Sequence, residues 1–261
     1  MIRLAINGAL GRMGREIFAL SLDDERFKVV GGIEIEGHSA IGKDYGIATG
    51  MKRIGIPISK NCSGFDVLID FSTPEGTLKA VELALKNRAT LVSGTTDLDE
   101  AHHRRFREVS KEIGLFWSSN FSRGIAALSD ISAKLARIFE DADIEIIEQH
   151  HRDKADSPSG TAYKIAERIA ESRQITIEDN VEFGRKGRTG PRKKGEIGIH
   201  SIRGGGIIGD HSVLFATPFE NLIIEHRAIS RHLFAHGALA AAAFIYGKVG
   251  YFDMNDIINL H

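Results

Sequence analysis

The feature that most constrains this fold is a regular alternation of short apolar runs and longer stretches in the first half of the chain. Five apolar runs lie at residues 3–7, 27–33, 65–71, 89–93 and 115–117, and several of the stretches between them have helical periodicity. Strands that alternate with helices form a parallel sheet, because each helix carries the chain back to the same edge. We therefore predict an α/β fold with a Rossmann-type doubly wound parallel sheet.

The first apolar run ends in a glycine-rich turn, G-A-L-G-R-M-G at residues 8–14, and an amphipathic stretch follows it. Strand, glycine turn and helix are the parts of a dinucleotide site, since glycines let the backbone approach a pyrophosphate and the helix N-terminus supplies N–H groups. Glu34 ends the second strand, where a carboxylate can bind the ribose hydroxyls of the adenosine half. Ile35 rather than arginine comes next, which favours NADH over NADPH, although Arg12 could reach a 2′-phosphate from the turn.

Polar residues also follow two later strands. Gly94 and Thr95 come directly after the fourth apolar run, and Ser118 and Asn120 come after the fifth. The carboxyl ends of parallel strands share one edge of a sheet, and ligands of such sheets bind at that edge. These residues and Gly8 are therefore expected to line one coenzyme site.

The pattern changes in the second half of the chain. Residues 196–203, 211–217 and 221–228 predict strands with only short turns between them. Consecutive strands without crossover helices imply a mixed or antiparallel sheet. We therefore predict a second α+β domain over residues 122–230.

A basic segment precedes the first of these later strands. Residues 184–195, G-R-K-G-R-T-G-P-R-K-K-G, contain six lysine or arginine residues. Such a run is usually a solvated loop, but it could also act as a lid that clamps an anionic ligand. Both interpretations stay open.

Composition excludes several other classes of protein. The formal net charge is −1, from 34 basic and 35 acidic residues, so no overall basic field favours nucleic acid. One cysteine, Cys62, allows no internal disulfide, and neither a signal peptide nor a spanning apolar segment is found, which predicts a cytoplasmic protein without a membrane partner. His232 and His236 have a ligand-compatible helical spacing, but no glutamate motif accompanies them, so no metal is expected.

The most concentrated chemistry lies in E-Q-H-H-R-D-K-A-D-S-P-S-G-T-A, residues 148–162. His150, His151 and Lys154 lie on a connection that leads to a predicted helix beginning at Thr161. The N–H groups of Gly160 and Thr161 at that helix N-terminus suit a carboxylate. Histidine suits proton transfer because its pKa lies near neutral pH. This combination indicates a small, multiply anionic substrate that must also receive a proton.

This stretch closely resembles the motif E-x-H-H-x-x-K-x-D-A-P-S-G-T-A of the 4-hydroxy-tetrahydrodipicolinate reductase (dihydrodipicolinate reductase) family of lysine biosynthesis. Only Ser157 departs from it, a small residue in place of alanine. The resemblance extends along essentially the whole chain, with departures at Leu10 in the glycine turn and at Ile35, where some members have arginine. The matching segments are residues 8–13, Glu34, Gly94-Thr95-Thr96, residues 118–121 and the C-terminal F-D-M-N-D-I-I at 252–258.

The resemblance implies an NAD(P)H-dependent reduction of 4-hydroxy-tetrahydrodipicolinate to tetrahydrodipicolinate with loss of water. It implies a dinucleotide-binding domain built from residues 1–121 and 231–261, a substrate-binding and oligomerisation domain at 122–230, and a homotetramer. His150 would be the proton donor and Lys154 a second acid and substrate anchor, although which of the two delivers the proton stays open. His151, Gly160 and Thr161 would bind substrate. The coenzyme would contact Gly8, Ala9, Leu10, Gly11, Arg12, Met13, Glu34, Gly94, Thr95, Thr96, Ser118, Ser119, Asn120 and Phe121.

Two other functions are compatible with the same coenzyme site. One is another two-domain NAD(P)-dependent dehydrogenase, although an aldehyde dehydrogenase needs a cysteine nucleophile and Cys62 has no such context. The other is a non-catalytic NAD-binding regulator, which would have no need of the cluster at residues 150–154.

Overall fold

The computed structural model describes residues 1–258, and contacts within the chain divide it into two units. The first unit joins Met1–Ser122 to the C-terminal segment that begins at His232, and the second unit is Arg123–Arg231. Residues 259–261, the last of the range predicted for the dinucleotide-binding domain, lie outside the described residues. In residues 1–258 no helix is both long and apolar enough to span a bilayer.

The first unit contains one seven-stranded sheet in which every described strand pairing is parallel. Its central strands are buried along their whole length, as strands covered on both faces must be. The predicted doubly wound fold is therefore confirmed. The strands are β1 (Ile2–Asn7), β2 (Phe27–Ile33), β3 (Ile58–Ser59), β4 (Val67–Asp70), β5 (Thr90–Ser93), β6 (Gly114–Trp117) and β12 (Gly250–Phe252), in the order β12-β6-β5-β4-β1-β2-β3.

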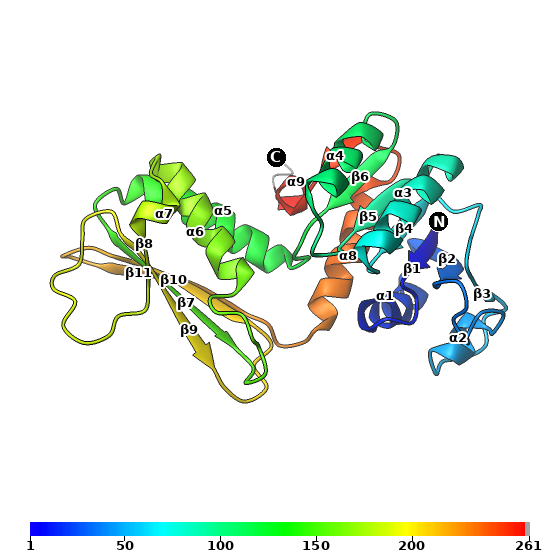
Figure 1. Ribbon diagram of the computed structural model, residues 1–261, viewed down its shortest axis with the longest axis horizontal. Coiled ribbons are helices and arrows are strands. Elements are labelled where there is room, and N and C mark those ends of the chain that lie inside the picture. The colour runs from blue at the N-terminus through cyan, green and yellow to red at the C-terminus, as the bar shows by residue number, and fades with distance from the viewer. Residues whose placement is uncertain (259–261) are drawn as a thin grey trace. The chain divides into compact units, whose positions relative to one another are not determined.

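Helices cover both faces of this sheet. α1 (Arg12–Leu22) packs with α8 (His232–Ile245) on one face, and α3 (Pro74–Asn87) packs with α4 (Glu100–Val109) on the other (Figure 1). α3 begins with a capping residue, Thr73, whose Oγ1 accepts a hydrogen bond from the N–H of Gly76, and Pro74 occupies its first turn.

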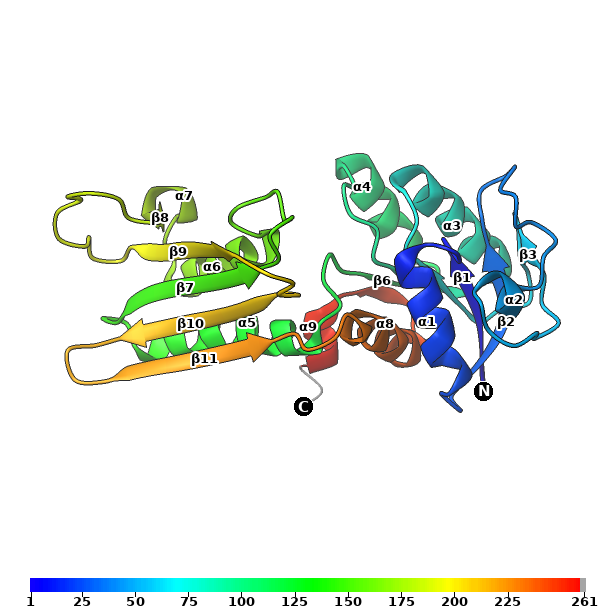
Figure 2. The same ribbon diagram turned by 90° about the horizontal axis from the view of Figure 1, so that it is seen from below.

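The second unit contains a five-stranded mixed sheet, as predicted. Its strands are parallel in the β7–β9 and β8–β9 pairs and antiparallel where β10 meets β7 and β11. Two helices cover one face, and Figure 2 shows that the opposite face carries no helix of this unit. The elements are β7 (Asp143–His150), β8 (Val181–Phe183), β9 (Ile197–Arg203), β10 (Asp210–Ala216), β11 (Asn221–Arg227), α5 (Arg123–Ile138) and α6 (Gly160–Arg173), with sheet order β11-β10-β7-β9-β8.

Periodicity does not predict the shortest elements. Each is only two to five residues long, which is shorter than the window in which an apolar pattern can be recognised. Besides β3, β8 and β12 they are the helices α2 (Tyr45–Ala48), α7 (Ile177–Asn180) and α9 (Met254–Ile258).

Candidate active site

The glycine turn lies between β1 and α1 and is packed too closely for larger side chains. Gly8 has a φ of +74°, and a Cβ there would lie 2.5 Å from the carbonyl oxygen of Phe71. A Cβ on Gly14 would lie 2.2 Å from the Gly8 carbonyl oxygen. Glycine is therefore required at both positions, whereas Leu10 replaces a glycine of the common motif at the outer part of the turn.

Glu34 follows β2 and reaches back to this turn. Its Oε1 accepts a hydrogen bond of 2.6 Å from the Leu10 N–H. The carboxylate thus holds the turn in place and also lies on the wall of a cavity of about 780 Å³. Of the residues predicted to bind coenzyme, Gly8, Gly11 and Glu34 line this cavity, together with Asn7, Phe71, Ser72, Thr73, Lys60 and Lys79, among others.

A buried carboxylate organises the neighbouring strand ends. Asp70, at the end of β4, is inaccessible to solvent and accepts five side-chain hydrogen bonds. Its partners come from β1, β5, α3 and the loops after β4 and β5. They are Asn7 Nδ2 at 2.7 Å, Ser72 Oγ at 2.5 Å, Thr77 Oγ1 at 2.6 Å, Ser93 Oγ at 2.9 Å and Thr95 Oγ1 at 3.0 Å.

The coenzyme-binding residues predicted at 94–96 and 118–121 occupy the loops after β5 and β6. Gly94 packs against Phe71, whose ring would lie 2.1 Å from a Cβ at position 94. Ser118 Oγ donates a 2.7 Å hydrogen bond to the Asn120 carbonyl. Phe121 is buried, with its ring centroid 5.2 Å from that of Phe71. The other predicted positions lie at the same sheet edge: Ala9, Arg12 and Met13 on the glycine turn and first turn of α1, and Thr95, Thr96 and Ser119 on these loops.

In the second unit, His150 ends β7 and contacts a buried acid. His150 Nδ1 lies 2.6 Å from Oε2 of Glu148, which is fully buried. Arg203 of β9 donates to both oxygens of the same carboxylate, at 2.7 and 2.8 Å. Burial by itself would raise the pKa of Glu148, but hydrogen bonds from Arg203, Ser201 and His150 outweigh it and hold that pKa at about 2.

A second imidazole lies beside the first. The ring centroid of His211 is 5.3 Å from that of His150, edge to face at 80°. His211 Nε2 lies 3.3 Å from Ser159 Oγ, and burial lowers the pKa of His211 to about 4. His211 is therefore neutral at physiological pH. Burial also lowers the pKa of His150, but the hydrogen bond and negative charge of Glu148 raise it again in part.

The connection after β7 leads to the α6 N-terminus as the sequence indicates. Ser159 Oγ caps the helix by accepting from the Ala162 N–H at 3.2 Å. Gly160 opens the helix, and a Cβ there would meet no atom within 4 Å, so the space in front of this first turn is open. Thr161 is half-buried beside it.

Lys154 and His151 lie on the same connection. Lys154 Nζ contacts both oxygens of Asp156, at 2.7 and 2.9 Å, and its side chain is about one-fifth exposed. The Lys154 N–H donates to the carbonyl of His151 at 3.2 Å. The structure thus brings together all five catalytic and substrate-binding residues predicted in the second unit, between the end of β7 and the start of α6.

The sequence did not reveal Glu148, Arg203 and His211 as parts of this site. Glu148 opens the quoted motif, and its place among alternating buried isoleucines of β7 is a signal that a buried partner must exist. Arg203 and His211 are 55 and 63 residues away from Glu148 along the chain. Only the pairing of β7 with β9 and β10 brings them beside it.

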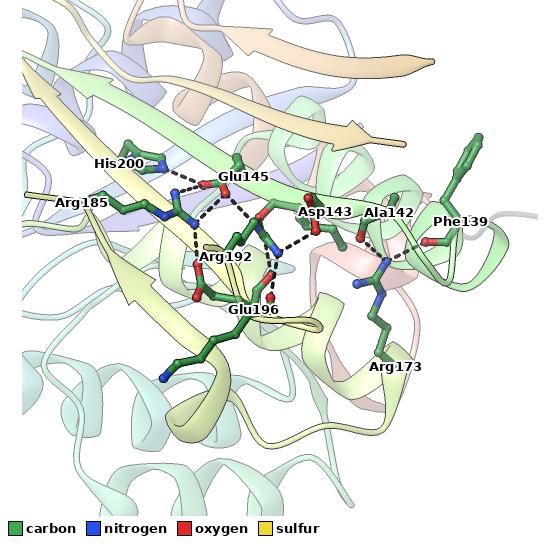
Figure 3. Close-up of polar contacts among 11 residues, drawn as sticks. Phe139, Ala142, Asp143, Glu145, Arg173, Arg185, Arg192, Glu196 and His200 are labelled. Atoms are coloured by element: carbon green, nitrogen blue, oxygen red, sulfur yellow. Dashed lines mark hydrogen bonds and ion pairs between the residues drawn. The ribbon is translucent and has the colours of Figure 1, made fainter. Parts of the chain in front are cut away.

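The basic segment 184–195 is partly tied down elsewhere. Arg185 and Arg192 both bind Glu145, at 2.9 and 3.0 Å, and His200 contacts the same carboxylate at 2.6 Å (Figure 3). Burial would raise the pKa of Glu145, but these hydrogen bonds hold it at about 2. Glu145 lies near the start of β7, about 16 Å along the strand from His150. These two arginines therefore stabilise the loop rather than clamp a ligand at residues 150–161.

Comparisons with known proteins concern both units. A family model described as dihydrodipicolinate reductase, N-terminus, matches residues 2–121, and one described as dihydrodipicolinate reductase, C-terminus, matches residues 124–258. A dipicolinate-bound dihydrodipicolinate reductase from Paenisporosarcina sp. TG-14 is 24% identical, with a TM-score of 0.77 over 97% of each chain.

Dehydrogenases named for other activities share the fold. An amine dehydrogenase from Mycobacterium smegmatis is 10% identical, with a TM-score of 0.58 over 98% of this chain and 95% of that chain. A myo-inositol dehydrogenase from Corynebacterium glutamicum ATCC 13032 is 14% identical, with a TM-score of 0.58 over 96% of this chain and 90% of that chain. At these identities the solved structures establish a common architecture.

Proposed function

Because this chain belongs to the dihydrodipicolinate reductase family, we propose that the cluster at residues 150–161 binds its substrate and protonates it. The activity is the NAD(P)H-dependent reduction of 4-hydroxy-tetrahydrodipicolinate to tetrahydrodipicolinate, with loss of water, in the diaminopimelate route of lysine biosynthesis. The observation that carries the assignment is the match of both halves of the chain to the two halves of one family.

The coenzyme is a nicotinamide dinucleotide, which supplies a hydride when bound. The cavity of the first unit suits such a group, because Gly8 and Gly11 expose backbone there and Glu34 adds a carboxylate. We propose that NADH is preferred over NADPH. The Glu34 carboxylate can accept hydrogen bonds from ribose hydroxyls but would repel a 2′-phosphate, and Ile35 adds no cation. Lys60 also lines the cavity, but Glu36 pairs with it at 2.6 Å.

The residues proposed to hold the substrate supply complementary charge to a dicarboxylate. The N–H groups of Gly160 and Thr161 and the Thr161 hydroxyl can bind one carboxylate at the positive end of α6. Lys154 and His151 can bind the second. Lys154 would exchange its contact with the exposed Asp156 for the substrate carboxylate, and such an exchange conserves an ion pair.

His150 is the proposed proton donor. Its Nδ1 is occupied by Glu148, which leaves Nε2 as the atom that can give a proton to the substrate. Lys154 lies close enough to His150 to lower its pKa electrostatically, so a nearby cation favours release of that proton. Lys154 then acts as anchor and second acid.

The test is a steady-state assay with NADH and freshly generated substrate, following the loss of NADH absorbance. We expect His150→Gln and Lys154→Ala to lower kcat roughly 100-fold or more, the usual contribution of a general acid, with NADH binding unchanged. His236→Gln, an exposed helix position in the other unit, is the matched control and should retain full activity. Wild-type turnover in His150→Gln would refute the assignment of the donor.

Coenzyme preference is tested separately by comparing kcat/KM for NADH and NADPH. The proposal requires NADH to be used more efficiently, and Glu34→Gln should narrow the difference by removing the carboxylate charge. A tenfold advantage of NADPH in the wild type would contradict the proposed role of Glu34.

We also propose a homotetramer in the cytoplasm. Leu222 and Ile224 of β11 pack on the helix-covered side of the second sheet, so Ile223 between them lies on the opposite face, where it is 62% exposed. An apolar residue of this kind on an uncovered sheet supports contact with another subunit. Sedimentation of the wild type and Ile223→Asp tests this, and a wild-type monomer at micromolar concentration would contradict it.

A further inference from the structure

We propose that Glu148 and Arg203 are positioning residues that act on His150 in opposite directions: Glu148 fixes its tautomer and holds its proton, and Arg203 weakens that hold. The inference deepens the proposed function, since it rests on His150 as the proton donor. It assigns a role to an ion pair between a fully buried carboxylate and a partly buried arginine, neither of which lines the coenzyme cavity.

The first observation is the complete enclosure of the Glu148 carboxylate. It is fully buried, and four donors surround it: Arg203 at 2.7 and 2.8 Å, His150 at 2.6 Å, the Ser159 N–H at 3.1 Å and the Ser201 hydroxyl. A buried carboxylate without such partners would be protonated or unstable. Glu148 is therefore an ionised acceptor whose position is fixed from several directions.

The second observation concerns the tautomer of His150. An ionised carboxylate can only accept hydrogen bonds, so the nitrogen that faces Glu148, Nδ1, must carry the hydrogen. Nε2 is then the nitrogen that gains and loses the second proton. Gly209 lies beside Nε2, and a Cβ at this position would come to 3.0 Å from that atom, so a side chain here would crowd it.

The third observation is the balance of charge around the ring. Glu148 favours the protonated imidazole, whereas Arg203 on β9 and Lys154 on the following turn oppose it. His211 on β10 faces the ring edge to face and is kept neutral by burial. Arg203 and His150 both donate to this one carboxylate, so the Arg203 cation partly neutralises the negative charge that would otherwise stabilise the imidazolium.

Replacing each of the two residues should therefore change the pKa of His150 in opposite directions. In Glu148→Gln the imidazolium loses its counter-charge, so the pKa of His150 should fall by about one unit or more. In Arg203→Met the carboxylate loses its competing cation and keeps His150 and two neutral donors, the Ser159 N–H and the Ser201 hydroxyl, so that pKa should rise by a similar amount. A residue needed only for folding would not change the pKa of His150 in opposite directions.

The experiment is a pH titration of the ¹⁵N-labelled imidazole of His150 by NMR in the full-length protein, for the wild type and both variants. The wild type should show the hydrogen on Nδ1, and Glu148→Gln should shift the tautomer balance because its amide can donate to that nitrogen. Glu145→Gln is the matched control, since this carboxylate lies on the same strand and also binds arginine but does not contact His150. It should leave the His150 titration unchanged.

The pH profile of kcat/KM gives the second readout. A proton donor must be protonated, so kcat/KM should fall as the pH rises through the pKa of His150. Compared with the wild type, this fall should begin at a lower pH in Glu148→Gln and at a higher pH in Arg203→Met. If the NMR titrations move as expected and the activity profiles do not, His150 is not the donor and the proposed function fails while the positioning role stands. Shifts of the His150 pKa in the same direction, or none, overturn the inference. If Glu148→Gln does not fold, Arg203→Met alone decides the test. A lowered or unchanged pKa of His150 in that variant then overturns the inference.

Discussion

The buried carboxylate of Asp70 offers a quantitative test of what holds the coenzyme edge of the first sheet together. Replacing it by alanine removes the acceptor of five hydrogen bonds. Asn7 can turn to Ser72 Oγ, already 3.1 Å away. Thr77 and Ser93 are fully buried and donate their hydroxyl hydrogens to Asp70, and water cannot replace it.

The expected loss of stability follows from these two hydroxyls. A buried donor that loses its acceptor costs roughly 1–3 kcal/mol, which gives about 4 kcal/mol for Asp70→Ala. Asparagine keeps one acceptor oxygen, so Asp70→Asn should cost about half as much. With an m-value of roughly 2 kcal/mol/M, the urea midpoint of the alanine variant should fall by about 2 M.

The chain supplies its own reporter for this assay. Its single tryptophan, Trp117, lies in the first unit and donates from Nε1 to the Thr95 carbonyl at 3.1 Å, so its fluorescence follows unfolding at this edge. Asp66→Asn is the matched control: Asp66 precedes the same strand but pairs with a half-exposed Arg3, and such pairs contribute about 0–1 kcal/mol. Equal midpoints for Asp70→Ala and Asp66→Asn would refute the reasoning.

Two further predictions concern packing and pH. Gly14→Ala should cost about 1–3 kcal/mol and raise the KM for coenzyme, because its Cβ would lie 2.2 Å from the Gly8 carbonyl oxygen; an unchanged Tm and KM would show that the turn can yield. Glu145 has its pKa held at about 2 against an ordinary 4.5, so its contribution to stability is present above pH 4.5 and is lost as pH falls towards 2. Calorimetry should find a lower Tm for Glu145→Gln than for the wild type at pH 7, and a smaller fall in Tm as the pH is lowered. Parallel curves of Tm against pH for the two proteins would contradict this.

The sequence predicts most of the fold because its apolar runs recur in a regular alternation with helical stretches, although β4, β5 and β6 have only four residues each. The glycine turn and the alternating runs establish the first sheet, and closely spaced strands establish the mixed sheet of the second unit. The elements that it misses, such as β8 and α7, are short and lie outside that alternation, and pairing or packing with other elements stabilises them.

The candidate site divides in the same way. His150, Lys154 and Gly160 are found from sequence because they lie on one short connection, where their chemistry is visible together. Arg203 and the hydrogen-bonded group around Asp70 are missed because their partners come from other strands. A single sequence does not specify which strands pair. A carboxylate in an otherwise apolar strand is the signal that such partners exist, although it does not identify them.

The path of the chain through the two units has a consequence for how the protein is made. The second unit is one continuous segment, and its sheet needs no residue from either end of the chain. The first unit needs both ends, because α8 packs on β4, β5 and β6, and β12 pairs with β6. The sheet whose first strand is synthesised first is thus completed last, and a chain that ended before α8 would contain every element of the second unit but would lack a helix and an edge strand of the first.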